Sequence, residues 1–239
     1  NLCLEATKDV DGVFHMAAFS RSGPSFDMPE QCHESNALGT LNILQACKKN
    51  GVKRIVYSGS STFYGNKIGV QKEGDPGDFL NFYGLTKHVG ELYVHQFYRN
   101  FGLECNILRY FNVYGPGQPS TGAYALVLGI FIDRFKKGQK LEIHGSGEQR
   151  RDFIHVQDIV KANFAAMNSE TVGEIFNIGS GINYSIKELA NFFPIENYHT
   201  ERRSGDAEET LADISKAQKQ LDWSPEISLE QGIRQLIEE

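Results

Sequence analysis

The sequence predicts an α/β protein built on a doubly wound parallel sheet, with a smaller lobe towards the C-terminal end. Short apolar runs bounded by turn residues alternate with longer segments of helical periodicity, as expected when helices cover both faces of parallel strands. The chain has 239 residues, of which 40% are hydrophobic and 23% charged, so it can bury a substantial core. Together these observations indicate one large globular unit or two closely packed ones.

The first half of the chain carries most of the predicted sheet. Each apolar run is too short for a helix and ends in small or polar residues, whereas the intervening segments show apolar residues at three- and four-residue spacing. We predict strands at 12–18, 52–58 and 104–111, and helices at 29–49 and 83–101.

In the second half of the chain, apolar runs and helical segments alternate less regularly. A Gly- and Pro-containing turn follows the third strand and begins this part, and a polar loop is predicted at 145–152. We predict helices at 125–137, 156–168, 213–221 and 229–237, and strands at 140–144 and 175–178. The expected division is a sheet domain of residues 1–115 and 153–181 and a substrate-binding lobe of residues 116–152 and 182–239.

Composition excludes several classes of function. The net charge of −6 and pI near 5.7 leave no basic footprint for nucleic acid, and no apolar run of about 18 residues predicts a membrane span. The first residues lack the pattern of a signal peptide, so a cytoplasmic protein is expected. The four cysteines have no paired spacing, which favours reduced thiols and predicts no metal site.

A phenol, an ammonium and two hydroxyls form the strongest candidate for catalysis. Tyr83 and Lys87 are four residues apart on a predicted helix and therefore share one face, roughly 40° apart. A nearby cation favours the phenolate of a tyrosine, whose pKa is ordinarily about 10. Ser60 and Thr62, at the end of the second strand, are placed to share a proton with the same substrate hydroxyl. The alternative is that both hydroxyls only cap the strand end.

The opposite face of this helix, which carries Leu85, Val89 and Leu92, is predicted to pack against the protein.

Several ordered motifs resemble the extended short-chain dehydrogenase/reductase family, and most closely its nucleotide-sugar 4-epimerases, typified by UDP-glucose 4-epimerase. The resemblance covers nearly the whole chain and implies a Rossmann-like fold. The matching segments, beside Ser60, Tyr83 and Lys87, are His15-Met16-Ala17-Ala18, Asn36-Ala37-Leu38-Gly39-Thr40, Arg109-Tyr110-Phe111-Asn112, Arg151-Asp152-Phe153-Ile154-His155-Val156, Phe176-Asn177-Ile178-Gly179 and Arg202-Arg203-Ser204-Gly205-Asp206.

The resemblance implies an NAD-dependent 4-epimerisation of a UDP-hexose through a transient keto-sugar. Tyr83 would be the base, Lys87 would lower its pKa and hold the nicotinamide ribose, and Ser60, assisted by Thr62, would bond the reacting oxygen. In related dehydratases an acidic pair follows the first hydroxyl, whereas this chain has Ser61 and Thr62, which favours epimerisation.

The remaining family positions imply binding roles. Substrate contacts are implied for Asn112, Arg151, Asn177, Arg203 and Asp206, and cofactor contacts for Ala17, Ala18, Asn36 and Ser58, beside Tyr83 and Lys87. A guanidinium suits a diphosphate because it donates bidentate, charge-assisted hydrogen bonds. The alternatives are surface ion pairs for the two arginines and a turn-forming role for Asn112.

The glycine-rich turn that holds a dinucleotide pyrophosphate has no match in this sequence. Neither Gly115-Pro116-Gly117 nor Gly145-Ser146-Gly147 has the required spacing, and we therefore expect the dinucleotide fold to be truncated at its N-terminal side by about two strand–helix units of roughly 30 residues each.

Three functional readings stay open: a 4-epimerase, a related dehydratase, decarboxylase or reductase, and a non-catalytic cofactor-binding protein. Family members often dimerise through two long helices, so a homodimer through residues 29–49 and 83–101 is expected.

Overall fold

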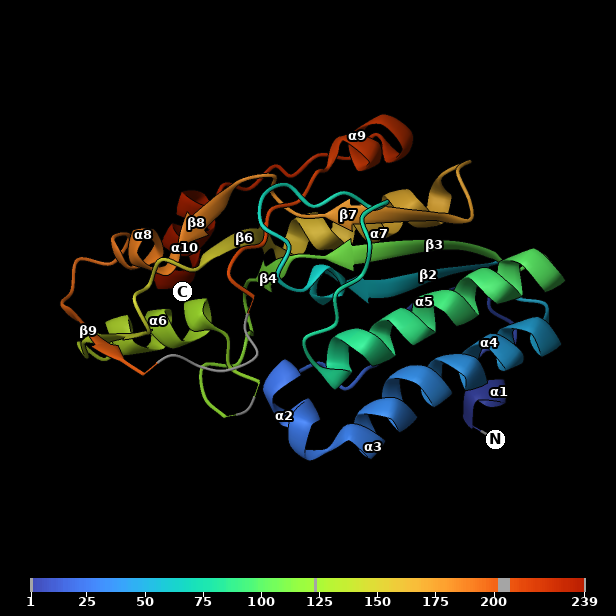
Figure 1. Cartoon of the computed structure of the whole chain (residues 1–239). Helices are drawn as coiled ribbons and strands as arrows, with labels where there is room; N and C mark the ends of the chain where they lie inside the picture. The colour runs from blue at the N-terminus through green and yellow to red at the C-terminus, as the bar shows by residue number, and fades with distance from the viewer. Residues whose placement is uncertain (1, 123, 202–206, 239) are drawn as a thin grey trace.

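A four-stranded parallel sheet forms the larger half of the protein, as the sequence predicts. The computed structural model describes residues 2–122, 124–201 and 207–238 (Figure 1). The strand order is β1 (Gly12–His15), β2 (Arg54–Ser60), β3 (Glu104–Tyr110) and β7 (Glu174–Ile178). All three pairings are parallel, which confirms the α/β class and the doubly wound sheet.

Helices cover both faces of this sheet (Figure 1). Successive residues of a strand point to opposite faces of the sheet, so the side chains of the buried strand β2 pack into the hydrophobic core on each face. Ile55 and Tyr57 pack with α4 (Gly39–Asn50) and α5 (Phe82–Phe101), whereas Val56 packs with α7 (Val156–Asn168) and α9 (Ser215–Leu221). The sheet is therefore the rigid centre on which the site is built.

The helix predicted at 29–49 is continuous in the chain but irregular in the middle. It begins as α3 (Pro29–His33), widens into the π-helical turn η1 (Glu34–Leu38) and continues as α4. Such π-turns occur mostly at functional sites, and this one carries the buried Asn36. Two short helices, α1 (Leu2–Ala6) and α2 (Ser22–Asp27), lie on the same side of the molecule.

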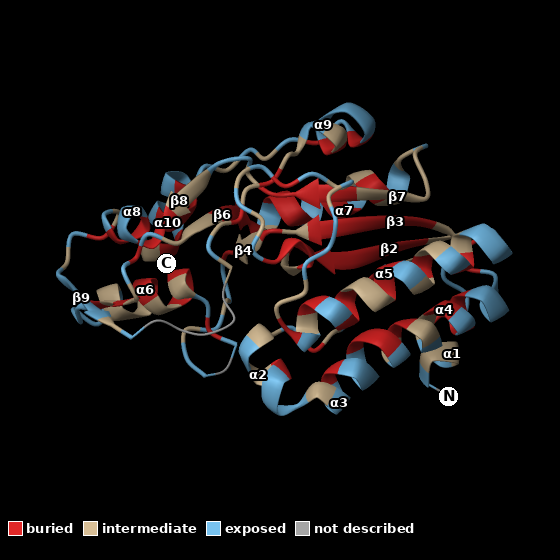
Figure 2. Ribbon diagram, viewed as in Figure 1, coloured by how far each residue is buried: buried red, intermediate tan, exposed pale blue. Residues whose placement is uncertain are grey.

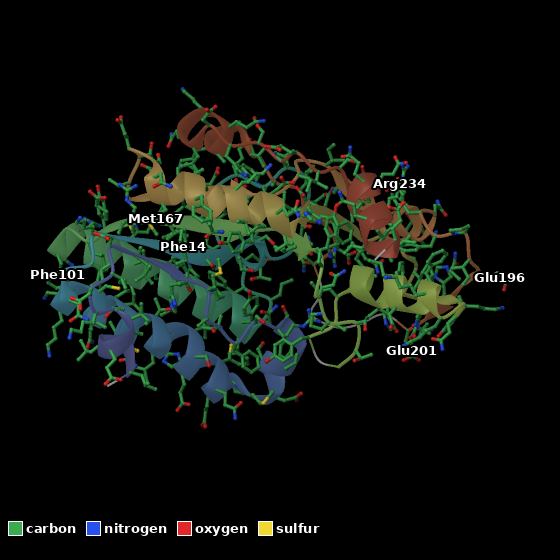
Figure 3. The ribbon with its side chains drawn as sticks, turned by 180° about the vertical axis from the view of Figure 1, so that it is seen from behind. Phe14, Phe101, Met167, Glu196, Glu201 and Arg234 are labelled. Atoms are coloured by element: carbon green, nitrogen blue, oxygen red, sulfur yellow. The ribbon has the colours of Figure 1, made fainter. Side chains whose placement is uncertain are left out.

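The smaller lobe has its own sheets and its own core. Its strands pair as β4–β6–β8 and as β5–β9, around an apolar cluster that includes Phe131, Leu189 and Ile233. Seen from behind, Glu196, Glu201 and Arg234 belong to this half and Phe14 and Met167 to the sheet half (Figure 3). The elements are β4 (Asn112–Tyr114), β5 (Leu141–His144), β6 (Arg150–His155), β8 (Asn183–Ser185), β9 (Asn197–Thr200), α6 (Val127–Lys136), α8 (Ile186–Ala190) and α10 (Leu229–Glu238).

Two sequence predictions differ from this arrangement. The polar loop predicted at 145–152 ends early, because Arg150 and Arg151 already belong to β6 and pair with β8. Their charged side chains interrupt the apolar pattern from which a strand is predicted, because this small sheet leaves both residues only half-buried. Residues 182–239 were assigned wholly to the smaller lobe, but α9 and Trp223 pack on the core of the parallel sheet.

The orientation of α5 is opposite to the prediction. Leu85 and Leu92, expected to pack, are 41% and 51% exposed, whereas the stripe containing Gly84, Lys87 and Gly90 faces the sheet. Figure 2 shows α5 buried towards the sheet and exposed on its outer side. Glycines on the inner stripe let the helix axis approach β2 closely, so small residues rather than leucines occupy that face.

Within the described residues the four cysteines are free thiols, and Cys32, Cys47 and Cys105 are buried. No helix in that part of the chain combines the length and apolarity needed to cross a bilayer.

Candidate active site

A cavity of about 660 Å³ lies where the parallel sheet meets the smaller lobe. Its walls include Ser60 at the end of β2, Tyr110 at the end of β3, and Arg151 from the smaller lobe. Ligands of doubly wound sheets bind outside the carboxyl ends of the strands, and this volume suits a small organic ligand. The cavity is thus the candidate active site.

Tyr83 and two hydroxyls meet in one wall of this cavity. Asn81 caps the start of α5 by accepting from the Gly84 amide at 2.9 Å, which places Tyr83 in the first turn. The Tyr83 phenol and the Ser60 side chain line the same cavity, and Ser60 is close enough to lower the pKa of the phenol. Thr62 donates its hydroxyl to Ser60 Oγ at 2.8 Å, and its amide also donates there at 3.3 Å. Ser60 therefore caps the turn that follows β2 and lies in the same wall as the phenol.

A positive charge that acts on the pKa of Tyr83 comes from a residue that the sequence analysis did not single out. Burial raises the pKa of the Tyr83 phenol, while the nearby Ser60 side chain and the positive charge of Arg21 act in the opposite direction. Lys87 was expected to supply this cation, but its ammonium lies over the ring of Tyr57 instead. Arg21, from the loop after β1, lines the same cavity as Tyr83 and contributes a positive charge that lowers the pKa of the phenol.

Lys87 is held one helical turn further from the cavity. Only 4% of its surface is exposed, its Nζ lies 4.3 Å from the centre of the Tyr57 ring, and the Tyr57 hydroxyl donates to its carbonyl oxygen at 3.0 Å. Burial lowers the pKa of Lys87 to about 8, and the nearby carboxylate of Glu91 opposes this shift. Among the described residues, no hydrogen bond or ion pair engages this ammonium. A buried cation with unused donors is fitted to hold hydroxyl groups of a ligand.

A buried ion pair behind the site was missed from the sequence. Arg109 donates two hydrogen bonds to Glu91, at 3.0 and 2.7 Å, and both residues are almost fully buried. Burial opposes ionisation of Glu91, but hydrogen bonds from His88 and Arg109 outweigh it and lower its pKa. Because Gly59 lies against this pair, a Cβ there would sit 2.8 Å from Glu91 Oε1. The pair therefore fastens α5 to the end of β3.

The residues predicted to bind substrate divide into three groups. Asn112 and Arg151 line the cavity, and Asn112 donates to the carbonyl of Asp152 and to Thr210. Arg203 and Asp206 lie outside the described residues. Asn177 is not among the residues that line the cavity: it is fully buried, and its amide bonds Tyr64 and the backbone of Gln71.

The residues predicted to bind cofactor cluster behind the same wall. Ala17 and Ala18 follow the carboxyl end of β1, and Ala17 is exposed. Asn36 is buried and bonds both backbone groups of Phe19 as well as Thr86, so it ties the loop after β1 to α5. Ser58 donates to Tyr110 within the sheet. Asn36 and Ser58 therefore support the wall rather than face the cavity.

Several cavity residues carried no motif that singled them out. They come from loops whose neighbours are set by the fold, although a cation just beyond a strand end, as in Arg21, is a usable signal. These residues are Arg21, Tyr124, Glu142, His144, Gln149 and Thr210.

Comparison with known proteins gives consistent matches. The sequence model of the NAD dependent epimerase/dehydratase family matches residues 2–179. A putative UDP-glucose 4-epimerase of Methanocaldococcus jannaschii is 40% identical, over 96% of this chain and 77% of that protein. A UDP-glucuronate 4-epimerase of Thermodesulfobacterium geofontis is 32% identical, over 97% of this chain and 72% of its own length. A UDP-N-acetyl-alpha-D-glucosaminuronate decarboxylase of Bacillus cytotoxicus is 31% identical, over 98% and 78%.

Solved structures resemble the whole chain equally well. The crystal structure of a UDP-glucose 4-epimerase from Thermotoga maritima with UDP-glucose has a TM-score of 0.95 and 32% identity, covering 99% of this chain and 80% of that one. A UDP-glucuronic acid 4-epimerase from Bacillus cereus, in complex with UDP-glucuronic acid and NAD, has a TM-score of 0.93 and 29% identity, covering 100% and 77%.

Proposed function

We propose the function of this chain from one premise: it belongs to the NAD-dependent epimerase/dehydratase family. The reaction that we propose is inversion of the fourth carbon of the hexose in a UDP-hexose, by transient oxidation to a keto-sugar. The observation that carries the proposal is that Tyr83 and Ser60 line one cavity, with the Ser60 side chain close enough to the phenol to lower its pKa.

NAD supplies the hydride acceptor for such a reaction, and the residues present fit its nicotinamide end. The buried Lys87 ammonium has donors available for ribose hydroxyls, as described above. The small side chains of Ala17 and Ala18, at the carboxyl end of β1, allow a ring to approach the sheet edge. Asn36 and Ser58 would position this wall from behind.

In this proposal Tyr83 removes the proton from the reacting hydroxyl of the sugar. Its phenol shares the cavity wall with Ser60 and Thr62, and the Thr62 hydroxyl donates to Ser60 Oγ at 2.8 Å. A positioned acid–base group contributes about 10²–10⁴-fold to such a rate. Ser61 and Thr62 carry no carboxylate that could expel water, which favours epimerisation over dehydration.

The UDP moiety is assigned to the smaller lobe, which corresponds to the substrate-binding lobe expected from the sequence. Arg151 and Asn112 line that side of the cavity, and we keep the assignment of Arg203 and Asp206 to UDP as part of the proposal. The runner-up reaction is decarboxylation, because one relative of this chain is a decarboxylase. Product analysis separates the two, since decarboxylation shortens the sugar by one carbon.

A homodimer is also part of the proposal. The outer face of α5 exposes Leu85 and Leu92, and the end of η1, which contacts α5, exposes Leu38. Two such faces would pack as a four-helix contact.

The test is Tyr83→Phe in the full-length protein, supplied with NAD and a panel of UDP-hexoses. We expect turnover to fall by at least about 100-fold while UDP-hexose affinity stays within a few-fold, because only the proton-transferring hydroxyl is removed. Tyr93→Phe on the same helix is the matched control and should leave both unchanged. Full activity in Tyr83→Phe refutes the role of Tyr83, and a wild-type protein that interconverts none of the sugars refutes epimerisation.

A further inference from the structure

A buried carboxylate beside the cavity has no part in the site described so far. Asp152, on β6, directly follows Arg151 and is fully buried. Its Oδ1 accepts from the Ser180 amide at 2.6 Å, and its Oδ2 accepts from the amides of Gly181 and Ala212 at 3.0 Å each. Burial raises the pKa of the Asp152 carboxyl, while these bonds oppose the rise by favouring the ionised form. One side chain therefore joins β6 to two other parts of the chain.

One of these parts is segment 207–213, which runs beside β6. On one side of the segment, the Thr210 amide donates to the carbonyl oxygen of Arg150 at 3.1 Å. On its other side, the Gln71 amide donates to the carbonyl oxygen of Leu211 at 2.8 Å. Segment 207–213 is thus held between a strand of the smaller lobe and the loop at Gln71.

Thr210 connects this segment to the residues that line the cavity. Its Oγ1 accepts from the Asp152 amide at 3.1 Å and from Asn112 Nδ2 at 2.9 Å. The guanidinium of Arg151 donates to the carbonyl oxygen of Glu208 at 3.4 Å. Because Asn112, Arg151 and Thr210 all line the cavity, one hydrogen-bonded group of residues forms this part of its wall.

The packing around the carboxylate is tight. A Cβ built on Gly179 would lie 2.7 Å from the Cβ of Ala212 and 2.8 Å from Oδ2 of Asp152, whereas ordinary contacts begin near 3.4 Å. Glycine at this position therefore lets the carboxylate and segment 207–213 meet directly. A carboxylate also suits its three amide partners because both of its oxygens accept, whereas a side-chain amide would turn a donor towards at least one of them.

We propose that Asp152 is a positioning residue for the UDP end of the substrate. Its carboxylate holds segment 207–213 against β6, and this contact sets the positions of Asn112, Arg151 and Thr210 in the cavity wall. The inference rests on the proposed function, which assigns this wall to UDP. It gives Asp152 a role in affinity and not in the proton transfer, since Asp152 does not line the cavity together with Tyr83.

The test is Asp152→Asn in the full-length protein, with UDP affinity measured by calorimetry and kcat and KM measured with NAD and a UDP-hexose. We expect the Kd of UDP and the KM of the sugar to rise by about ten-fold or more, because the new amide opposes a backbone donor and displaces segment 207–213. The kcat at saturating substrate should stay within about three-fold. A merely structural role predicts the reverse, a smaller folded fraction whose UDP affinity is unchanged.

Asp158→Asn is the matched control. Asp158 is also fully buried and accepts from the backbone amides of Glu226 and Ile227 at 3.1 Å each, but neither of these residues lines the cavity. This variant should lose stability and keep the UDP affinity of its folded fraction within about three-fold. Circular dichroism measures the folded fraction of both variants.

Hydrogen exchange of the wild type tests the same coupling without a substitution, and it decides the question if Asp152→Asn does not fold. Saturating UDP should slow exchange in a peptide covering residues 207–213 more than in one covering residues 223–228, because binding stabilises the segment that positions the site. Equal slowing of both peptides overturns the positioning role of Asp152, and so does unchanged UDP affinity in a folded Asp152→Asn variant. Failure of UDP and of every UDP-hexose to bind the wild type overturns the proposed function itself.

Discussion

Replacing Gly90 with alanine tests how closely α5 must pack on β2 to carry Lys87. A Cβ built on Gly90 would lie 2.1 Å from the hydroxyl oxygen of Tyr57 and 2.7 Å from its Cζ, whereas ordinary contacts begin near 3.4 Å. Tyr57 is fully buried, and its hydroxyl donates to the Lys87 carbonyl at 3.0 Å. The ring therefore cannot turn away without breaking that bond.

The expected cost follows from three contributions. Overpacking a filled core destabilises by about 1–3 kcal/mol. Loss of the Tyr57 hydrogen bond leaves a buried hydroxyl unsatisfied, which costs another ~1–3 kcal/mol. Alanine is a better helix former than glycine and returns about 1 kcal/mol. The net expectation is a loss of roughly 3 kcal/mol in the free energy of unfolding, within a range of about 1–5 kcal/mol.

Urea denaturation followed by circular dichroism measures this loss directly. Gly39→Ala is the matched control, because a Cβ on that helical glycine would meet its nearest atom at an ordinary 3.4 Å. This control should unfold at the same urea concentration as the wild type or a higher one. In a Tyr57→Phe background the closest ring atom is 2.7 Å away, so the penalty for Gly90→Ala should shrink. A Gly90→Ala protein as stable as the wild type refutes the tight packing of α5 on Tyr57.

Two further predictions concern pH and assembly. Burial, and after it the charge of Lys87, lowers the pKa of His15 to about 4. As pH falls below 6.5, His15 is therefore protonated in the unfolded chain before it is protonated in the folded protein. The stability present above pH 6.5 should be lost as pH falls towards 4. The loss is on the order of 3 kcal/mol; His15→Asn should flatten the profile of unfolding free energy between pH 7 and 4, and an unchanged slope contradicts the assignment. Leu92→Asp on the outer face of α5 should convert the proposed dimer to a monomer in light scattering, whereas Val160→Asp on α7, which is similarly exposed, should not. A dimer that survives Leu92→Asp places the contact elsewhere.

Local patterns explain why much of the fold could be predicted. The helix predicted at 156–168 has the bounds of α7, and the helix predicted at 83–101 begins one residue after the start of α5. Each depends on signals within one turn or one strand: apolar spacing, glycine at the end of a helix, and an asparagine cap. The positions of Ser60 and Tyr83 follow from such signals, because one ends a strand and the other begins a helix.

Tertiary contacts decided the features that could not be predicted. Leu85 and Leu92 satisfy the pattern of a buried stripe, but Gly84 and Gly90 on the other face allow closer contact with the sheet, and that face is the one buried. Asn177 lies in a motif shared with the family, yet its amide oxygen accepts from Tyr64, which is 113 residues earlier in the chain. Neither outcome is visible in a window of neighbouring residues.

The positions of two cationic residues, Arg21 and Lys87, show how the topology determines the site. Arg21 follows β1 and Ser60 ends β2, and because the two strands are parallel and adjacent, both residues reach the same edge of the sheet. Lys87, on the helix after β2, is drawn below that edge onto the ring of Tyr57. Spacing along the helix identified Lys87 as the neighbour of Tyr83, but strand order brings Arg21 to the cavity. The position of Arg21 therefore follows from the order of the parallel strands, whereas the position of Lys87 follows from its place on α5.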